Sequence, residues 1–120
     1  MSRRVVAVVP DLFFAARITE TARAAGATLV QPTVAVALER CRELPADLVI
    51  LDLGAGAATI ELARSLKADA ATRAIPIVGF YSHVDVATRA AALAAGADEV
   101  LPRSAFVARL PELLGAAAGT

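Results

Sequence analysis

The chain has 120 residues, 12 basic and 12 acidic, with 58% of its residues hydrophobic, so we expect a single domain over residues 1–120. Its balanced charge provides no long-range field for nucleic acid or anionic membranes, and no apolar run approaches the roughly 20 residues of a membrane span. The one cysteine, Cys41, excludes an intrachain disulfide and gives no reason to expect secretion, which makes a cytoplasmic protein the natural expectation.

Five short apolar runs predict the strands of a sheet. In chain order they cover residues 5–9, 28–30, 48–51, 77–81 and 100–101. Most of them are rich in β-branched residues, and they are continuous rather than alternating. This pattern is typical of parallel strands that are covered on both faces.

Segments with helical spacing of apolar side chains lie between these runs. The first places Phe14, Ile18 and Ala22 on one face, and later segments do the same around Leu38, Leu62, Ala90 and Leu110. Four residues are expected as N-caps: Asp11, Thr33, Asp85 and Ser104. Gly26 and Gly96 each precede a strand and are expected to end a helix in the left-handed conformation.

The last helix contains a proline, Pro111. Proline removes a backbone hydrogen bond and clashes with the preceding turn. We therefore expect the helix either to kink at Pro111 or to restart with this residue in its first turn.

Strands that alternate with helices predict an α/β fold with right-handed crossovers. Five such units in a chain of this length suit a flavodoxin-like, doubly wound parallel sheet of five strands. The expected strand order is 2-1-3-4-5, with helices on both faces of the sheet.

Polar residues follow the strands at the edge where ligands of such folds bind. Asp11, Asp52, Ser82 and Arg103 each stand at or just after the end of a predicted strand. Two carboxylates with open positions suit Mg²⁺, which keeps several of its waters. Such an ion could hold a phosphoryl group during transfer to a carboxylate nucleophile.

Five segments in order resemble the response-regulator receiver domain of the CheY-like family. They are residues 8–11, Arg17-Ile18, residues 47–53, residues 75–78 and residues 96–103. The resemblance covers nearly the whole chain. It implies a signalling domain rather than an enzyme, one that accepts a phosphoryl group from a histidine kinase with Mg²⁺.

The resemblance also implies roles for individual residues. Asp52 is then the candidate phosphoacceptor. Asp11, Asp52 and the backbone carbonyl of Gly54 are the candidate metal ligands. Arg103 stands where the family has a lysine, as a candidate contact to phosphate or carboxylate, and Ser82 is a candidate hydroxyl contact.

Several site positions depart from the family pattern. Pro10 replaces one of two paired acids, and Tyr81 stands where a small hydroxyl residue is usual, with Ser82 next to it. Arg103 keeps the charge of the lysine but is longer and planar. Val100 stands where a switching aromatic residue is common. We therefore expect an atypical or pseudo-receiver variant with a weakened Mg²⁺ site.

The main hypothesis is a free-standing receiver-like protein that signals by protein–protein interaction, with weak or absent phosphorylation at Asp52. Its partner would be a histidine kinase, a downstream effector or a second copy of the chain. A working phosphoacceptor in a two-component phosphorelay is the alternative. A small ligand-binding or enzymatic flavodoxin-like domain is a second one. Two structural roles also stay open: Asp11 as a helix cap only, and Arg103 in a permanent pair with Asp52.

Overall fold

The computed structural model describes residues 3–82 and 85–115. Within them lies one parallel sheet in the order β2-β1-β3-β4-β5, which confirms the predicted topology. The strands are β1 (Arg4–Val8), β2 (Thr28–Val30), β3 (Leu48–Asp52), β4 (Ile77–Tyr81) and β5 (Glu99–Pro102). Register pairs such as Val6 with Val49 and Asp52 with Phe80 align the carboxyl ends of the central strands at one edge.

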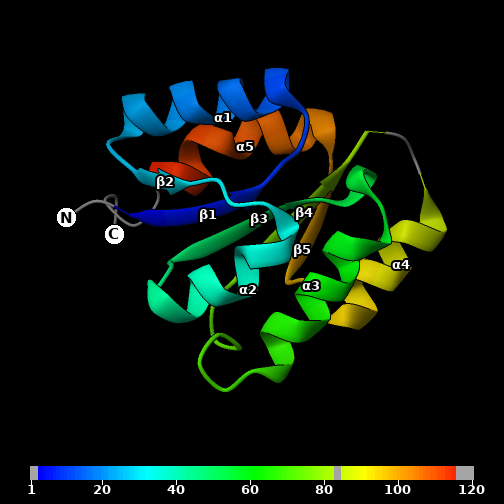
Figure 1. Ribbon diagram of the computed structural model, residues 1–120. Helices are drawn as coiled ribbons and strands as arrows, with labels where there is room; N and C mark the ends of the chain where they lie inside the picture. The colour runs from blue at the N-terminus through cyan, green and yellow to red at the C-terminus, as the bar shows by residue number, and fades with distance from the viewer. Residues whose placement is uncertain (1–2, 83–84, 116–120) are drawn as a thin grey trace.

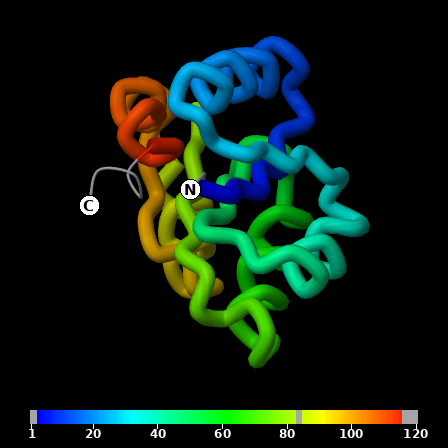
Figure 2. The backbone as a smooth tube through the Cα atoms, turned by 90° about the vertical axis from the view of Figure 1, so that its left-hand side faces the viewer, coloured from blue at the N-terminus to red at the C-terminus, as the bar shows by residue number. Residues whose placement is uncertain are grey.

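Helices cover both faces of the sheet, as Figure 1 shows. Figure 2, turned by 90°, shows the same layers from the side. The helices are α1 (Leu12–Ala25), α2 (Val34–Glu43), α3 (Ala57–Ala68), α4 (Val86–Ala95) and α5 (Arg103–Gly115), with a short 3₁₀ helix, η1 (Leu53–Ala55). α1 and α5 lie on one face, and α2, α3 and α4 lie on the other. No helix in the described ranges is long and apolar enough to cross a membrane.

A separate apolar core fills each side of the sheet. In β1, Val5 and Ala7 face α1 and α5, whereas Val6 and Val8 face α2 and α3. Both faces of the strand are therefore buried, which explains why the apolar runs in the sequence are continuous. The core under α1 and α5 also contains three aromatic rings, those of Phe14, Phe80 and Phe106, with centroids 4.5–5.9 Å apart.

The helix ends confirm most of the predicted caps. Asp11 and Asp85 cap α1 and α4 through their side chains, while Thr33 occupies the N-cap position of α2 without a side-chain hydrogen bond. Gly26 and Gly96 end their helices at φ 74° and 111°. The prediction of Ser104 as a cap is wrong, because α5 already begins at Arg103.

Pro111 lies inside α5, which continues as one helix to Gly115. The alternative in which the helix restarts at Pro111 is therefore wrong. Pro111 is exposed, whereas Leu110, Leu113 and Leu114 on either side of it are buried. The core contacts of these leucines hold the helix together across the hydrogen bond that proline cannot donate.

Candidate functional site

The candidate site lies at the carboxyl edge of the sheet. Asp52 ends β3, Asp11 and Ser82 lie just beyond β1 and β4, and Arg103 directly follows β5. Because the strands are parallel, these ends meet at one edge, as the sequence predicted. The structure brings all four residues to this edge, but it pairs them differently from the expectation.

Asp52 is held in a nearly closed environment. Its residue surface is only 7% exposed, and its Oδ1 accepts a hydrogen bond from the amide of Gly54 at 2.9 Å. Burial raises the pKa of the Asp52 carboxyl, while the Gly54 amide and the charge of Arg103 act in the opposite direction. Of the two acids at this edge, Asp52 is therefore the one whose charged form is less favoured.

Asp11 has the opposite environment. Its Oδ1 accepts hydrogen bonds from the amides of Phe13 and Phe14 at 3.0 and 3.1 Å, which confirms the predicted cap. The bond from Phe14 is the main cause that lowers the pKa of Asp11, and Arg103 lowers it further. One oxygen of Asp11 is thus committed to α1, and the other faces Arg103.

Arg103 contacts Asp11 instead of Asp52. Its Nη2 lies 3.5 Å from Asp11 Oδ2, and its Cζ lies 4.3 Å from the centre of the Phe14 ring. In the part of the chain described, Arg103 forms no ion pair with Asp52, so the alternative of a permanent pair between these two residues is wrong. The physical reason is the ring of Phe14, on which the guanidinium stacks, because it directs the side chain toward the start of α1.

The hydrogen-bond donors of Arg103 are poorly satisfied in this position. A guanidinium has five N–H donors, and here one nitrogen approaches a carboxylate at a distance too long for a strong hydrogen bond. The Nε of Arg103 is buried without a hydrogen-bond partner among the described residues. Stacking on Phe14 compensates part of this cost.

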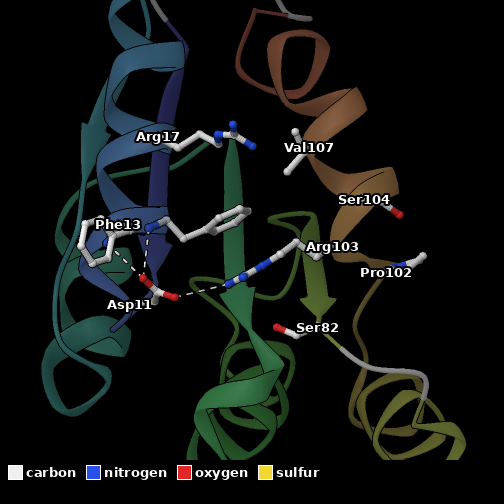
Figure 3. Close-up of a pocket in the computed structure, with 9 residues that line it drawn as sticks. Asp11, Phe13, Arg17, Ser82, Pro102, Arg103, Ser104 and Val107 are labelled. Carbon is white, nitrogen blue, oxygen red and sulfur yellow. Dashed lines mark hydrogen bonds and ion pairs between the residues drawn. The ribbon is translucent and has the colours of Figure 1, made fainter.

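A pocket of about 830 Å³ opens above this pair, between α1 and α5. Figure 3 shows Arg17 and Arg103 reaching into it, with Val107 opposite and the Ser82 hydroxyl below. Its lining consists of Asp11, Phe13, Phe14, Arg17, Ser82, Pro102, Arg103, Ser104 and Val107. A second pocket, of about 480 Å³, includes Gly54 and Ser82. Asp52 is not among the lining residues of either pocket.

The residues at this edge fit Mg²⁺ poorly. No group of three acidic, histidine or cysteine side chains comes together as a metal site within residues 3–82 and 85–115. One oxygen of Asp11 caps α1, its other oxygen faces a guanidinium, and Asp52 has committed one oxygen to Gly54. A dication placed on these carboxylates would meet the positive charge of Arg103 at close range.

The roles of three residues at the site were not predicted from the sequence. Phe14 was identified as a core residue, but its stacking with Arg103 joins positions far apart in the chain. Arg17 lies one turn after Phe14 on α1, which places both side chains on one helix face. Thr59 is buried, and its hydroxyl donates to the carbonyls of Asp52 and Gly56. One feature of the sequence could have indicated the role of Thr59. Gly56 precedes α3 and has no side chain with which to cap this helix.

Comparison with known proteins identifies the fold. No family model matches the chain, and no curated protein matches it. Solved structures do match. Chemotaxis protein CheY4 of Vibrio cholerae aligns with a TM-score of 0.82 at 17% identity, covering 95% of this chain and 97% of that one.

Two further response regulators give similar values. One from Hahella chejuensis has a TM-score of 0.82 at 25% identity and covers 94% of this chain and 92% of its own. One from Thermotoga maritima has a TM-score of 0.80 at 16% identity, with full coverage of both chains. The chain therefore has the fold of response-regulator receiver domains.

Proposed function

We propose that this protein is a cytoplasmic receiver-like signalling protein that acts through protein–protein interaction, with weak or absent phosphorylation at Asp52. Its partner is a histidine kinase, a downstream effector or a second copy of the chain. The observation that carries the proposal is the position of Arg103, stacked on Phe14 and directed at Asp11. This arrangement occupies the acid that a phosphoryl-transfer site would need.

Transfer of a phosphoryl group to a carboxylate requires an accessible nucleophile and positive charge on the transferring group. Asp52 is largely buried, and one of its oxygens is engaged by the Gly54 amide. The nearby positive charge of Arg103 is shared with Asp11. Both features support low reactivity of Asp52 toward phosphoryl donors.

The surface beside the site supports contact with another protein. Leu12 and Phe13 begin α1, and they are 83% and 92% exposed. Adjacent large apolar side chains with this exposure are a common feature of protein contacts. Their position next to Asp11 places such a contact beside the candidate site.

The proposal is tested by incubating the protein with Mg²⁺ and acetyl phosphate and measuring its intact mass. The Asp52→Asn variant is the matched control, because it keeps the shape and the acceptor for Gly54 but cannot accept the phosphoryl group. We expect little or no phosphate adduct on either protein. One adduct per chain on the wild type alone would contradict the proposal and favour a working phosphoacceptor.

A further inference from the structure

The pocket between α1 and α5, called here the α1/α5 pocket, has a volume of about 830 Å³. Ligand sites in proteins commonly measure about 300–1,000 Å³. We propose that the α1/α5 pocket binds a small organic anion, in which a carboxylate or phosphate group is attached to a compact apolar body. This site does not depend on phosphorylation of Asp52, which is not part of its lining.

Positive charge in the α1/α5 pocket exceeds negative charge. Two guanidinium groups line it, those of Arg17 and Arg103, against one carboxylate, that of Asp11. Asp11 is already matched by two α1 amides and by Arg103. The positive charge of Arg17 is therefore not balanced by a carboxylate among the residues that line the pocket.

Arg17 is the main candidate for direct recognition of the anion. Its side chain makes no hydrogen bond or ion pair with any residue in the described ranges. It extends from α1 into the space in front of Val107 on α5, as Figure 3 shows. Most exposed arginines in this chain have a carboxylate partner on their own helix, such as Arg23 with Glu20. Arg17 thus presents a free planar fork of donors, which suits carboxylate and phosphate groups.

Arg103 and Ser82 provide further donors in the same pocket. The side chain of Arg103 is 36% exposed, and its ion pair with Asp11 uses Nη2 at 3.5 Å. The Ser82 hydroxyl points toward the same space in Figure 3 and has no hydrogen-bond partner within the described ranges. An oxyanion lying between the two arginines could accept a short, charge-assisted hydrogen bond from Arg103, in place of the long 3.5 Å contact with Asp11.

The apolar part of the lining indicates the kind of body to which the anionic group of the ligand is attached. The apolar lining includes the rings of Phe13 and Phe14 on the α1 side and the side chains of Pro102 and Val107 on the α5 side. A bare inorganic anion would leave these surfaces in contact with water. A ligand with a small aromatic or aliphatic body would bury them and gain the hydrophobic contribution as well.

The probes are phenyl phosphate, benzoate, inorganic phosphate and benzyl alcohol, each titrated into the full chain at low ionic strength with calorimetry or NMR shifts as the readout. We expect saturable binding of phenyl phosphate, benzoate or both, with weaker binding of inorganic phosphate. Benzyl alcohol, which has the apolar body without the charge, should not saturate. The affinities of phenyl phosphate and benzoate then show whether the site prefers a phosphate or a carboxylate group.

Arg17→Gln should weaken binding of the preferred anion about tenfold, the usual effect of losing one charge-assisted contact. Arg89→Gln is the matched control, because Arg89 is also exposed and unpaired within the described ranges but lies on α4, on the opposite face of the sheet. It should bind like the wild type. Asp52→Asn should bind at least as well as the wild type, because it removes a nearby negative charge.

Three results would overturn the proposal: no saturable binding of any anion, equal affinity of wild type and Arg17→Gln, or equal loss in Arg17→Gln and Arg89→Gln. Inorganic phosphate that binds as tightly as phenyl phosphate would overturn the apolar part of the ligand class. Phenyl phosphate is a poor phosphoryl donor, so the outcome is independent of whether Asp52 accepts a phosphoryl group from acetyl phosphate.

Discussion

Two ion pairs lie at opposite edges of the sheet, and they differ in how completely their donors and acceptors are used. At the amino edge, Lys67 Nζ donates to the carbonyls of Arg73 and Ile75 and to Asp98 Oδ2, at 3.0–3.2 Å. Asp98 Oδ2 also accepts from the amide of Ile77, the first residue of β4, at 2.7 Å. The ammonium of Lys67 and one oxygen of Asp98 are therefore both tied to the backbone that starts or precedes a strand.

At the carboxyl edge, Arg103 reaches Asp11 at 3.5 Å, its Nε has no partner within the described ranges, and burial raises the pKa of Asp52. Charged groups with a full set of partners mainly stabilise the fold, whereas charged groups with spare donors remain able to bind something else. The comparison therefore separates a structural ion pair from a site available for recognition.

The largest expected effect is at the amino edge. Asp98→Ala removes the acceptor for both Lys67 and the Ile77 amide, so it should lower the free energy of unfolding by about 2 kcal/mol. Urea denaturation measures this value. Asp98→Asn, which keeps a neutral acceptor, should lose clearly less. A change within error for Asp98→Ala would mean that this pair is not structural.

The equivalent change at the carboxyl edge should cost less. Arg103→Met removes one long ion pair and the stacking on Phe14 but keeps much of the apolar stem. We expect a loss of about 1 kcal/mol or less in the same denaturation assay. A loss that exceeds that of Asp98→Ala would reverse the proposed difference between the two edges.

Asp52→Asn should stabilise the protein slightly at neutral pH. Burial raises the pKa of Asp52 in the folded state, so the folded protein binds this proton more tightly than the unfolded chain. The favourable contribution is complete below the ordinary pKa of about 4 and is lost as the pH rises through the raised value. The gain from Asp52→Asn should therefore appear at pH 7 and vanish near pH ~3, as measured by urea denaturation at both pH values. A loss of stability at pH 7 would contradict this account of Asp52.

Asp11→Asn should have the smallest effect at neutral pH, because asparagine caps a helix about as well as aspartate. Hydrogen bonds from Phe14 and Phe13 lower the pKa of Asp11, so its charged form stabilises the fold above the ordinary pKa. That contribution is lost as the pH falls through the lowered value. Thermal unfolding in acid should accordingly show a weaker pH dependence for Asp11→Asn than for the wild type. Identical profiles would mean that the cap does not favour the charged form.

The features predicted correctly from the sequence depend on local chemistry. The strands followed from continuous apolar runs such as residues 48–51, their order followed from the alternation of five strands with helices, and the caps at Asp11 and Asp85 followed from residue type and position. The partner of Arg103 could not be predicted in this way. It depends on where α5 begins and on a stacking contact with Phe14, on the far side of the pocket. Pro111 shows the same limit, since tertiary packing of its neighbours overrides its local preference.

We propose that the arrangement of Arg103 and Asp11, together with Pro10 in place of a second acid, keeps Asp52 unreactive. The most direct test is the intact mass of a Pro10→Asp, Arg103→Lys double variant after incubation with Mg²⁺ and acetyl phosphate, compared with the wild type and with the double variant that also carries Asp52→Asn. We expect one phosphate adduct on the double variant and little or none on the other two proteins. A wild type that is already fully modified at Asp52, or a folded double variant as inert as the wild type, would contradict it.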